Sequence, residues 1–163
     1  MVLMVEPIYK AVKDVKDKFQ LQSPPVILTS AKGKQFSQKL ADDYSKKENL
    51  IIICGHYEGV DERVKEYVAN EEVTIGPYVL TGGELPAMVI TDTLVRLISG
   101  VLGNEESLNE ESYTSEDGTE YPQYTRPAIF KTESGQEWKV PNVLLEGNHE
   151  LIGKWRKEQQ KKT

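Results

Sequence analysis

Four segments of the chain place apolar residues three or four positions apart, which is the spacing of an amphipathic helix: 7–20, 36–44, 61–68 and 84–98. The segment 84–98 is apolar on much of its circumference. We therefore expect it to be buried or to lie at an interface.

Short runs rich in branched apolar residues separate these helices. Strands are predicted at 26–29, 50–54 and 73–75. The run 50–54 is continuously apolar, which predicts a strand buried on both faces. Because helices and strands alternate, the pattern is typical of an α/β fold with parallel strands. Ligands of such folds bind in loops beyond the carboxyl ends of the strands, here 29–34, 54–60 and 75–84.

The pattern changes after residue 103. Residues 104–120 are acidic with hardly any apolar side chains, which predicts a mobile loop. Order is expected again over 142–155, with an extended piece at 143–145 and a closing helix capped by Asn148.

Composition narrows the class of protein. The chain has 163 residues, a net charge of -6, two histidines and a single cysteine, Cys54. The negative charge argues against a protein that holds nucleic acid mainly through non-specific phosphate contacts. One cysteine makes no internal disulfide, and these residues do not favour a metal site, so a reducing, cytoplasmic setting is predicted. No apolar run reaches the length of a membrane helix.

The glycine-containing loops leave two interpretations open. The loop 54–60 (CGHYEGV) is either an ordinary strand-to-helix turn or a place where a ligand approaches the backbone. The loop 75–84 has Gly76, Gly82 and Gly83, but it lacks the spacing of a phosphate-binding or dinucleotide-binding loop. Its exposed backbone groups suit the edge of a purine.

Arg96 also has two interpretations. It stands four residues after Asp92, which permits an ion pair within the helix. An arginine inside a largely apolar helix alternatively meets an anion or a developing negative charge.

Six motifs in these loops and beyond resemble one known family: MVEPIY (4–9), CGHYEGVDERV (54–64), IGPYVLTGGELPAM (75–88), GVLGNEES (100–107), EYPQYTRP (120–127) and VPNVLLEGNH (140–149). The family is that of the bacterial tRNA (guanine-N1)-methyltransferases, TrmD, of the SPOUT class. The resemblance extends from Met1 to Thr163.

The resemblance implies a SPOUT-type α/β fold, a parallel sheet flanked by helices with a deep C-terminal trefoil knot. It implies methylation of N1 of the guanosine just 3′ of the anticodon in tRNA by S-adenosylmethionine, in a homodimer with shared active sites. The motifs place these residues in the cofactor site: Ser30, Gly33, Gly55, Tyr57, Glu58, Gly59, Ile75, Gly76, Tyr78, Leu80, Gly82, Gly83 and Pro86.

The resemblance also assigns catalytic roles. Arg96 matches the family arginine that stabilises charge at O6 of guanine, and Glu111 occupies the position of the family's catalytic base. The family has an aspartate there, and Asp117 is a second candidate for the base.

The resemblance predicts a catalytic domain over 1–153 that lacks the family's N-terminal strand region, followed by a basic linker over 154–163 toward an absent tRNA-binding domain. An alternative is therefore open, namely a catalytically weak or silent fragment that binds cofactor and dimerises. A third interpretation, an RNA-binding module without a methyl donor, is disfavoured by the negative charge.

Overall fold

The computed structural model describes residues 1–102 and 120–160. The chain divides into two compact units, residues 1–103 (unit 1) and 104–163 (unit 2). The catalytic domain over 1–153 and the linker over 154–163 stay predictions.

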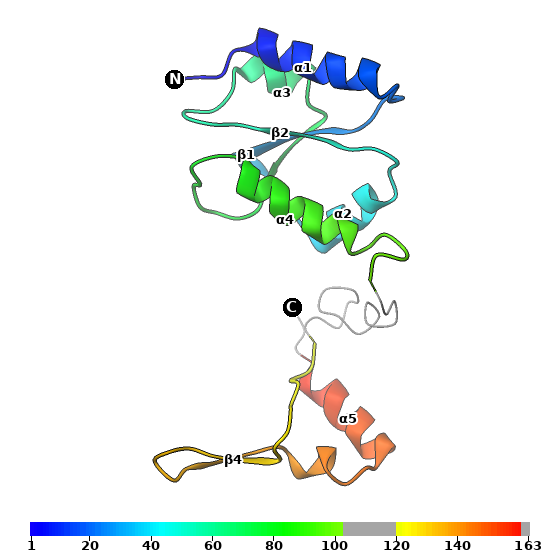
Figure 1. The fold of residues 1–163 in the computed structure, drawn as a ribbon, viewed down its shortest axis with the longest axis vertical. Coiled ribbons are helices and arrows are strands. Elements are labelled where there is room, and N and C mark those ends of the chain that lie inside the picture. The colour runs from blue at the N-terminus through cyan, green and yellow to red at the C-terminus, as the bar shows by residue number, and fades with distance from the viewer. Residues whose placement is uncertain (103–119, 161–163) are drawn as a thin grey trace. The chain divides into compact units, whose positions relative to one another are not determined.

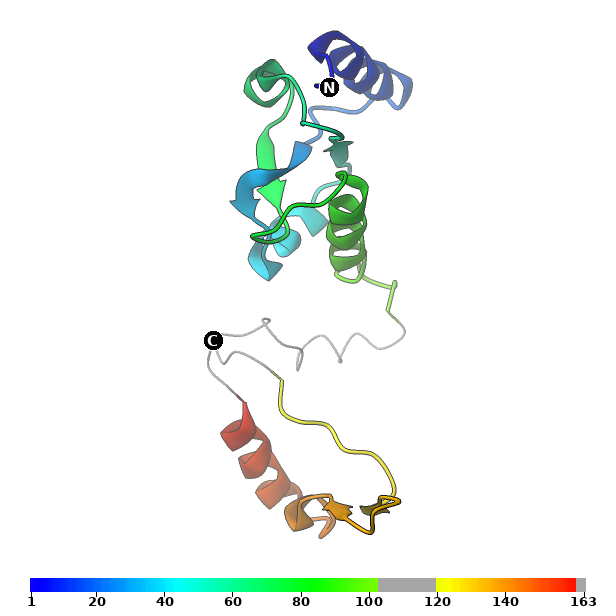
Figure 2. The same ribbon diagram turned by 90° about the vertical axis from the view of Figure 1, so that its left-hand side faces the viewer.

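Unit 1 has helices on both faces of a parallel sheet (Figures 1 and 2). The sheet contains β1 (Val26–Gln35), β2 (Ile51–Cys54) and β3 (Glu71–Thr74) in the order β2-β1-β3, and both pairings are parallel. Helices α1 (Val5–Lys18) and α3 (Glu62–Tyr67) cover one face, and α2 (Gln38–Ser45) and α4 (Glu84–Val95) cover the other. The predicted parallel α/β class is confirmed.

Two apolar clusters fix these layers, and β1 contributes to both. Val26 and Leu28 belong to the cluster on the side of α1 and α3, whereas Ile27 belongs to the cluster on the side of α2 and α4. Alternate residues of a strand point to opposite faces of the sheet, so one strand serves two cores. Ile27 meets Ile90 of α4 in its cluster, and both are fully buried.

The strand that is buried on both faces is not the one that the sequence pattern predicted. The prediction that 50–54 is buried on both faces is wrong, because β2 lies beside β1 alone in this sheet and only Ile53 among its residues is buried. The strand buried on both faces is β1, whose first four residues are all buried. Both runs are continuously apolar, and only long-range pairing distinguishes them.

The predicted loop 29–34 is an excursion within β1. The register against β3 shifts between Thr29 and Lys34, which both pair with Val73. Residues 30–33 bulge from the sheet at this point. The helices lie close to their predicted positions, although α4 ends at Val95 and not at residue 98.

Unit 2 contains a hairpin and a helix. Strands β4 (Ile129–Lys131) and β5 (Glu137–Lys139) pair antiparallel, which the sequence pattern did not predict. Asn142–Leu144 is a 3-10 helix, so the predicted extended piece at 143–145 is wrong. Helix α5 (His149–Gln159) is capped by Asn148, whose side chain accepts from the N–H groups of residues 150 and 151. This predicted cap is confirmed.

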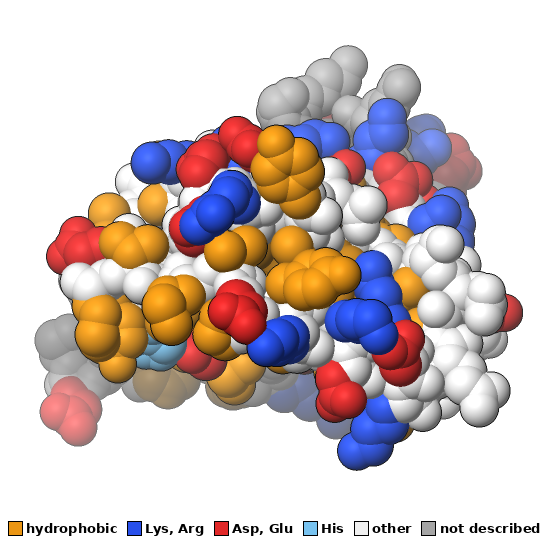
Figure 3. Space-filling model, turned by 90° about the horizontal axis from the view of Figure 1, so that it is seen from above, with side chains coloured by type: hydrophobic (Ala, Val, Ile, Leu, Met, Phe, Trp, Pro, Cys, Tyr) orange, Lys and Arg blue, Asp and Glu red, His pale blue; other side chains and the backbone are white. Residues whose placement is uncertain are grey.

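The face seen from above in Figure 3 carries both signs of charge. Basic and acidic side chains are interleaved there with apolar ones. Helix α1 carries the exposed ion pairs Lys10–Glu6 and Lys13–Asp17, each 2.6 Å long. Among the described residues, no helix is long and apolar enough to cross a membrane.

Candidate functional site

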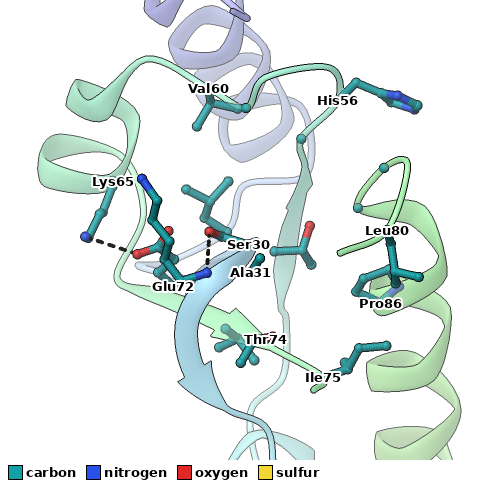
Figure 4. A pocket seen from close by; sticks show the side chains of 18 of the residues that line it. Ser30, Ala31, His56, Val60, Lys65, Glu72, Thr74, Ile75, Leu80 and Pro86 are labelled. Carbon is teal, nitrogen blue, oxygen red and sulfur yellow. Dashed lines mark hydrogen bonds and ion pairs between the residues drawn. The ribbon is translucent and has the colours of Figure 1, made fainter. Parts of the chain in front are cut away.

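The three predicted loops meet in one pocket at the carboxyl ends of the strands of unit 1 (Figure 4). This is where ligands bind in open parallel sheets, because the loops there are free to vary while the strands hold them in place. Most of the residues that the motifs assign to the cofactor site line it: Ser30, Gly55, Tyr57, Gly59, Ile75, Tyr78, Leu80, Gly82, Gly83 and Pro86.

Gly33, Glu58 and Gly76 do not line the pocket. A Cβ at Gly33 would lie 2.5 and 2.6 Å from the backbone C and O of Glu72, so this glycine permits the close approach of β1 to β3. A Cβ at Gly76 would lie 2.6 Å from Cζ of Tyr78, whose ring folds over it. The backbone N–H of Glu58 donates to the carbonyl of Met1 at 3.1 Å.

Gly82 and Gly83 have different surroundings. A Cβ at Gly83 would meet the side chain of Thr29 and lie 2.7 Å from Cα of Cys54. Thr29 and Cys54 both belong to strands of the sheet, which cannot easily move. A Cβ at Gly82 would instead lie 2.8 Å from the imidazole of His56 and would meet the carboxylate of Glu84, which are the ends of flexible side chains.

The second and third loops are fastened to each other beside the pocket. The N–H of Gly83 donates to the carbonyl of Gly55 at 2.8 Å, and His56 forms an antiparallel bridge with Gly82. Nε2 of His56 also lies 2.9 Å from Oε1 of Glu84. Both side chains are substantially exposed, so this contact adds little stability compared with the backbone bond.

The loop 54–60 has an uncommon backbone conformation. Tyr57 has a φ of 60° and Gly59 a φ of 106°. A tyrosine in the left-handed region is uncommon, and such residues concentrate at functional sites. The N-terminal segment holds this loop, since the N–H of Leu3 donates to the carbonyl of Gly59 at 2.9 Å.

One wall of the pocket is charged, and the motifs assigned no role to its residues. Nζ of Lys65 lies 3.1 Å from Oε2 of Glu72 and 3.3 Å from Oε1 of Glu62. Burial raises the pKa of Glu72, but hydrogen bonds from Ser30 and Lys65 outweigh it and hold the pKa below its ordinary value. The carboxylate is therefore ionised at neutral pH. Neither Lys65 nor Glu72 stands in one of the three loops, which is why the motifs did not reveal them.

Cys54 lies at the end of β2 and is half-buried. Burial, with a smaller contribution from the charge of Glu84, raises the pKa of the thiol. The thiol is thus protonated and unreactive at neutral pH. The described residues contain no group of three side chains suited to hold a metal ion.

Arg96, one of the two predicted catalytic residues, does not line this pocket. Arg96 follows the last residue of α4, whereas Pro86, in the first turn of the same helix, lines the pocket. Ten residues of helix separate the two by about 15 Å. Glu111 and the second candidate base, Asp117, lie outside the described residues.

Comparison with known proteins supplies the context for this geometry. All residues, 1–163, match the family model described as "tRNA (Guanine-1)-methyltransferase TrmD". The chain belongs to this family. The resemblance drawn from the six motifs is therefore confirmed, and membership implies a SPOUT α/β fold.

Several curated relatives of this family are named tRNA (guanine-N(1)-)-methyltransferase. The protein of Staphylococcus carnosus is 51% identical over 160 residues, which cover 98% of this chain and 61% of the relative. That of Moorella thermoacetica is 52% identical over 159 residues, with coverage of 98% and 61%. That of Listeria innocua is 48% identical over 164 residues, with coverage of 100% and 64%. The chain thus spans less than two thirds of the length of these relatives.

Proposed function

We propose that the chain takes part in the transfer of a methyl group from S-adenosylmethionine to N1 of the guanosine immediately 3′ of the anticodon in tRNA. The observation that carries this proposal is the single pocket formed by three loops in a chain that matches the TrmD family throughout. The names of the relatives agree with the reaction.

The residues present fit an adenosine-containing methyl donor. Ile75, Leu80 and Pro86 provide apolar surface for a flat ring, and the last two stand on one side of the pocket in Figure 4. Gly55 and Gly82 leave backbone groups accessible to the polar edge of a purine. When bound, S-adenosylmethionine supplies a methyl group on a positively charged sulfur. The chain's own task is to hold that group in place and to exclude competing water.

The acceptor defines what the catalytic residues must do. Guanine N1 carries a proton at neutral pH, so a base must remove it, and negative charge then develops at O6. In this proposal Glu111 is the base, with Asp117 as the second candidate, and the guanidinium of Arg96 stabilises the charge at O6. Because Glu111 has one methylene more than the family's aspartate, its carboxylate must fold back to reach the same proton.

A homodimer with shared active sites is part of the proposal. The outer face of α4 exposes large apolar side chains, among them Leu85, Met88 and Val89, with exposed fractions of 60%, 66% and 46%. Such a face loses unfavourable contact with water when a second copy covers it. The separation of about 15 Å between Arg96 and Pro86 along one helix also supports a site completed by another chain.

The remaining parts of the proposal follow from the same family. They are the trefoil knot of the SPOUT class, the catalytic domain over 1–153 with its linker, and action on tRNA in the cytoplasm.

A methyl-transfer assay tests the proposal. The chain is incubated with unmodified tRNA and tritiated S-adenosylmethionine, alongside a chain extended to the full length of the relatives. Transfer to the guanosine 3′ of the anticodon is expected, and Arg96→Ala is expected to lower kcat by about 10²- to 10³-fold. Loss of Arg96 should leave donor affinity unchanged. Donor binding without transfer in either chain would favour the alternative, a silent fragment that binds cofactor.

A further inference from the structure

The charged wall of the pocket contains both signs in close contact. Lys65 bridges Glu62 and Glu72 at 3.3 and 3.1 Å, and Lys32 lines the pocket beside them. The two partners of the shorter contact are not equally buried, because the Glu72 side chain is 13% exposed and the Lys65 side chain 46%. A nearly buried carboxylate at the edge of a cavity indicates more than a surface ion pair.

The wall lies opposite the apolar part of the pocket. Figure 4 shows Ser30, Glu72 and Lys65 on one side and Leu80 and Pro86 on the other. The pocket thus has an apolar end and an ionic end. A ligand that fills both must itself be flat and apolar at one end and charged at the other.

We propose that Lys65 and Glu72 bind the α-amino-acid end of the methyl donor, with the ammonium group on Glu72 and the carboxylate on Lys65. This assignment rests on the proposed function, since it names the part of the donor that the ionic wall recognises. The motifs and the family comparison assign no role to either residue.

The hydrogen-bonding capacity of the wall is not exhausted by its internal contacts. A carboxylate offers about four acceptor positions, and the contacts of Glu72 with Lys65 and Ser30 use only part of them. An ammonium group has three N–H donors. The ammonium of Lys65 contacts only two partners in the pocket wall, Glu62 and Glu72. Each residue therefore has capacity for one group of a zwitterion.

The presence of both signs favours an amino acid over a ribose. A ribose diol needs only an acceptor, which Glu72 alone would supply. Two lysines and two glutamates line this wall, so their formal charges cancel. A neutral wall of paired charges complements a zwitterion, whose own charges also cancel and whose two ends need opposite partners.

Calorimetric titration of the 163-residue chain with three ligands tests the assignment. S-adenosylhomocysteine has both charged groups, its decarboxylated form keeps only the ammonium, and 5′-methylthioadenosine keeps neither while retaining the ribose and adenine. The unsubstituted chain is expected to bind S-adenosylhomocysteine about tenfold or more tightly than 5′-methylthioadenosine, because hydrogen bonds to charged groups are the strong ones.

Two substitutions separate the two contacts. Lys65→Met is expected to weaken S-adenosylhomocysteine by about three- to tenfold and to leave the other two ligands unchanged. Glu72→Gln keeps the size of the side chain and one oxygen acceptor, and it is expected to weaken both amine-bearing ligands but not 5′-methylthioadenosine. The matched controls are Lys10→Met and Glu6→Gln on α1, an exposed ion pair of 2.6 Å outside the pocket, which should change no affinity.

Three results would overturn the assignment. Equal affinity of the unsubstituted chain for S-adenosylhomocysteine and 5′-methylthioadenosine would show that the amino-acid end is not recognised, while leaving the proposed function intact. A loss of 5′-methylthioadenosine affinity in Glu72→Gln as large as that of S-adenosylhomocysteine would assign the carboxylate to the ribose. Failure of all three ligands to bind would remove the proposed function together with this inference.

Discussion

A Cβ atom at Gly83 would lie 2.7 Å from Cα of Cys54 and 2.8 Å from the backbone N of Gly55. Backbone atoms at the end of a strand cannot shift cheaply, so the residue must be a glycine for the loops to close on each other. At the neighbouring Gly82, a Cβ would meet only the movable ends of His56 and Glu84. The two adjacent glycines of the motif therefore have different roles. Gly83 is needed for the fold, and Gly82 is needed for the pocket.

Alanine at these two positions should therefore have unequal effects. Gly83→Ala is expected to lower the free energy of unfolding by about 1–3 kcal/mol, the cost of inserting a methyl group into a filled site. Gly82→Ala is expected to cost less, because His56 and Glu84 can rotate away. Urea unfolding of both variants measures this difference. A greater loss in Gly82→Ala would contradict the division of roles.

The helix α3 shows how an element begins and how its start responds to pH. Asp61 is its N-cap and accepts from the N–H of Arg63 at 3.0 Å, and Nη2 of Arg63 lies 2.7 Å from its other oxygen. These bonds, with that to the side chain largest, lower the pKa of the Asp61 carboxyl from 3.8 to about 2. A lowered pKa in the folded state means that the ionised carboxylate stabilises the fold.

Acid should remove this stabilisation. It is fully present above the unfolded pKa of 3.8 and is lost as the pH falls toward about 2. Asp61→Asn keeps a capping oxygen but lacks the charge, so its urea midpoint should lie below that of the unsubstituted chain at about pH 6 and approach it at about pH 2. A difference between the midpoints that stays constant over this range would show that Arg63 contributes nothing through charge.

Most elements of unit 1 could be predicted because their signal is local. The helical spacing of Ile8, Val12 and Val15 and the apolar run of β2 are readable in windows of a few residues. The sequence could not show which strand is buried on both faces, since this depends on which strands pair. The hairpin of β4 and β5 was missed for a related reason, because strands of three residues have too few positions to show alternation.

Some residues of the candidate site could be predicted from the sequence, and others could not. Loops at strand ends carry glycines and motifs, so the sequence alone indicates that Gly55, Gly82 and Pro86 lie near one another. Lys65 comes from a helix and Glu72 from within a strand. Their contact depends on how the short connection between α3 and β3 turns the two elements toward the pocket, and no motif in the sequence marks that turn.

For the molecule as a whole, the proposed function requires a second copy of the chain. Met88 is 66% exposed on α4, whereas Ile90 of the same helix is fully buried. Met88→Glu should therefore leave the fold intact while placing a charge on the surface that a partner covers. Sedimentation velocity is expected to show a dimer for the unsubstituted chain and a monomer for Met88→Glu, with the circular dichroism spectrum unchanged.

A substitution on another helix serves as the control for Met88→Glu. Lys13→Glu on α1 introduces the same acidic residue at an exposed position and should leave the dimer intact. A monomeric unsubstituted chain at concentrations of about 100 µM would contradict the proposed interface.

The proposed methyl transfer depends on the pocket of unit 1 binding the methyl donor. Calorimetric titration of the chain with S-adenosylhomocysteine tests this binding without tRNA or catalysis. One site per chain is predicted, with a dissociation constant in the micromolar range, and Gly82→Leu should abolish binding while the fold is retained. An absence of binding, or an affinity that Gly82→Leu leaves unchanged, would contradict the assignment of the pocket.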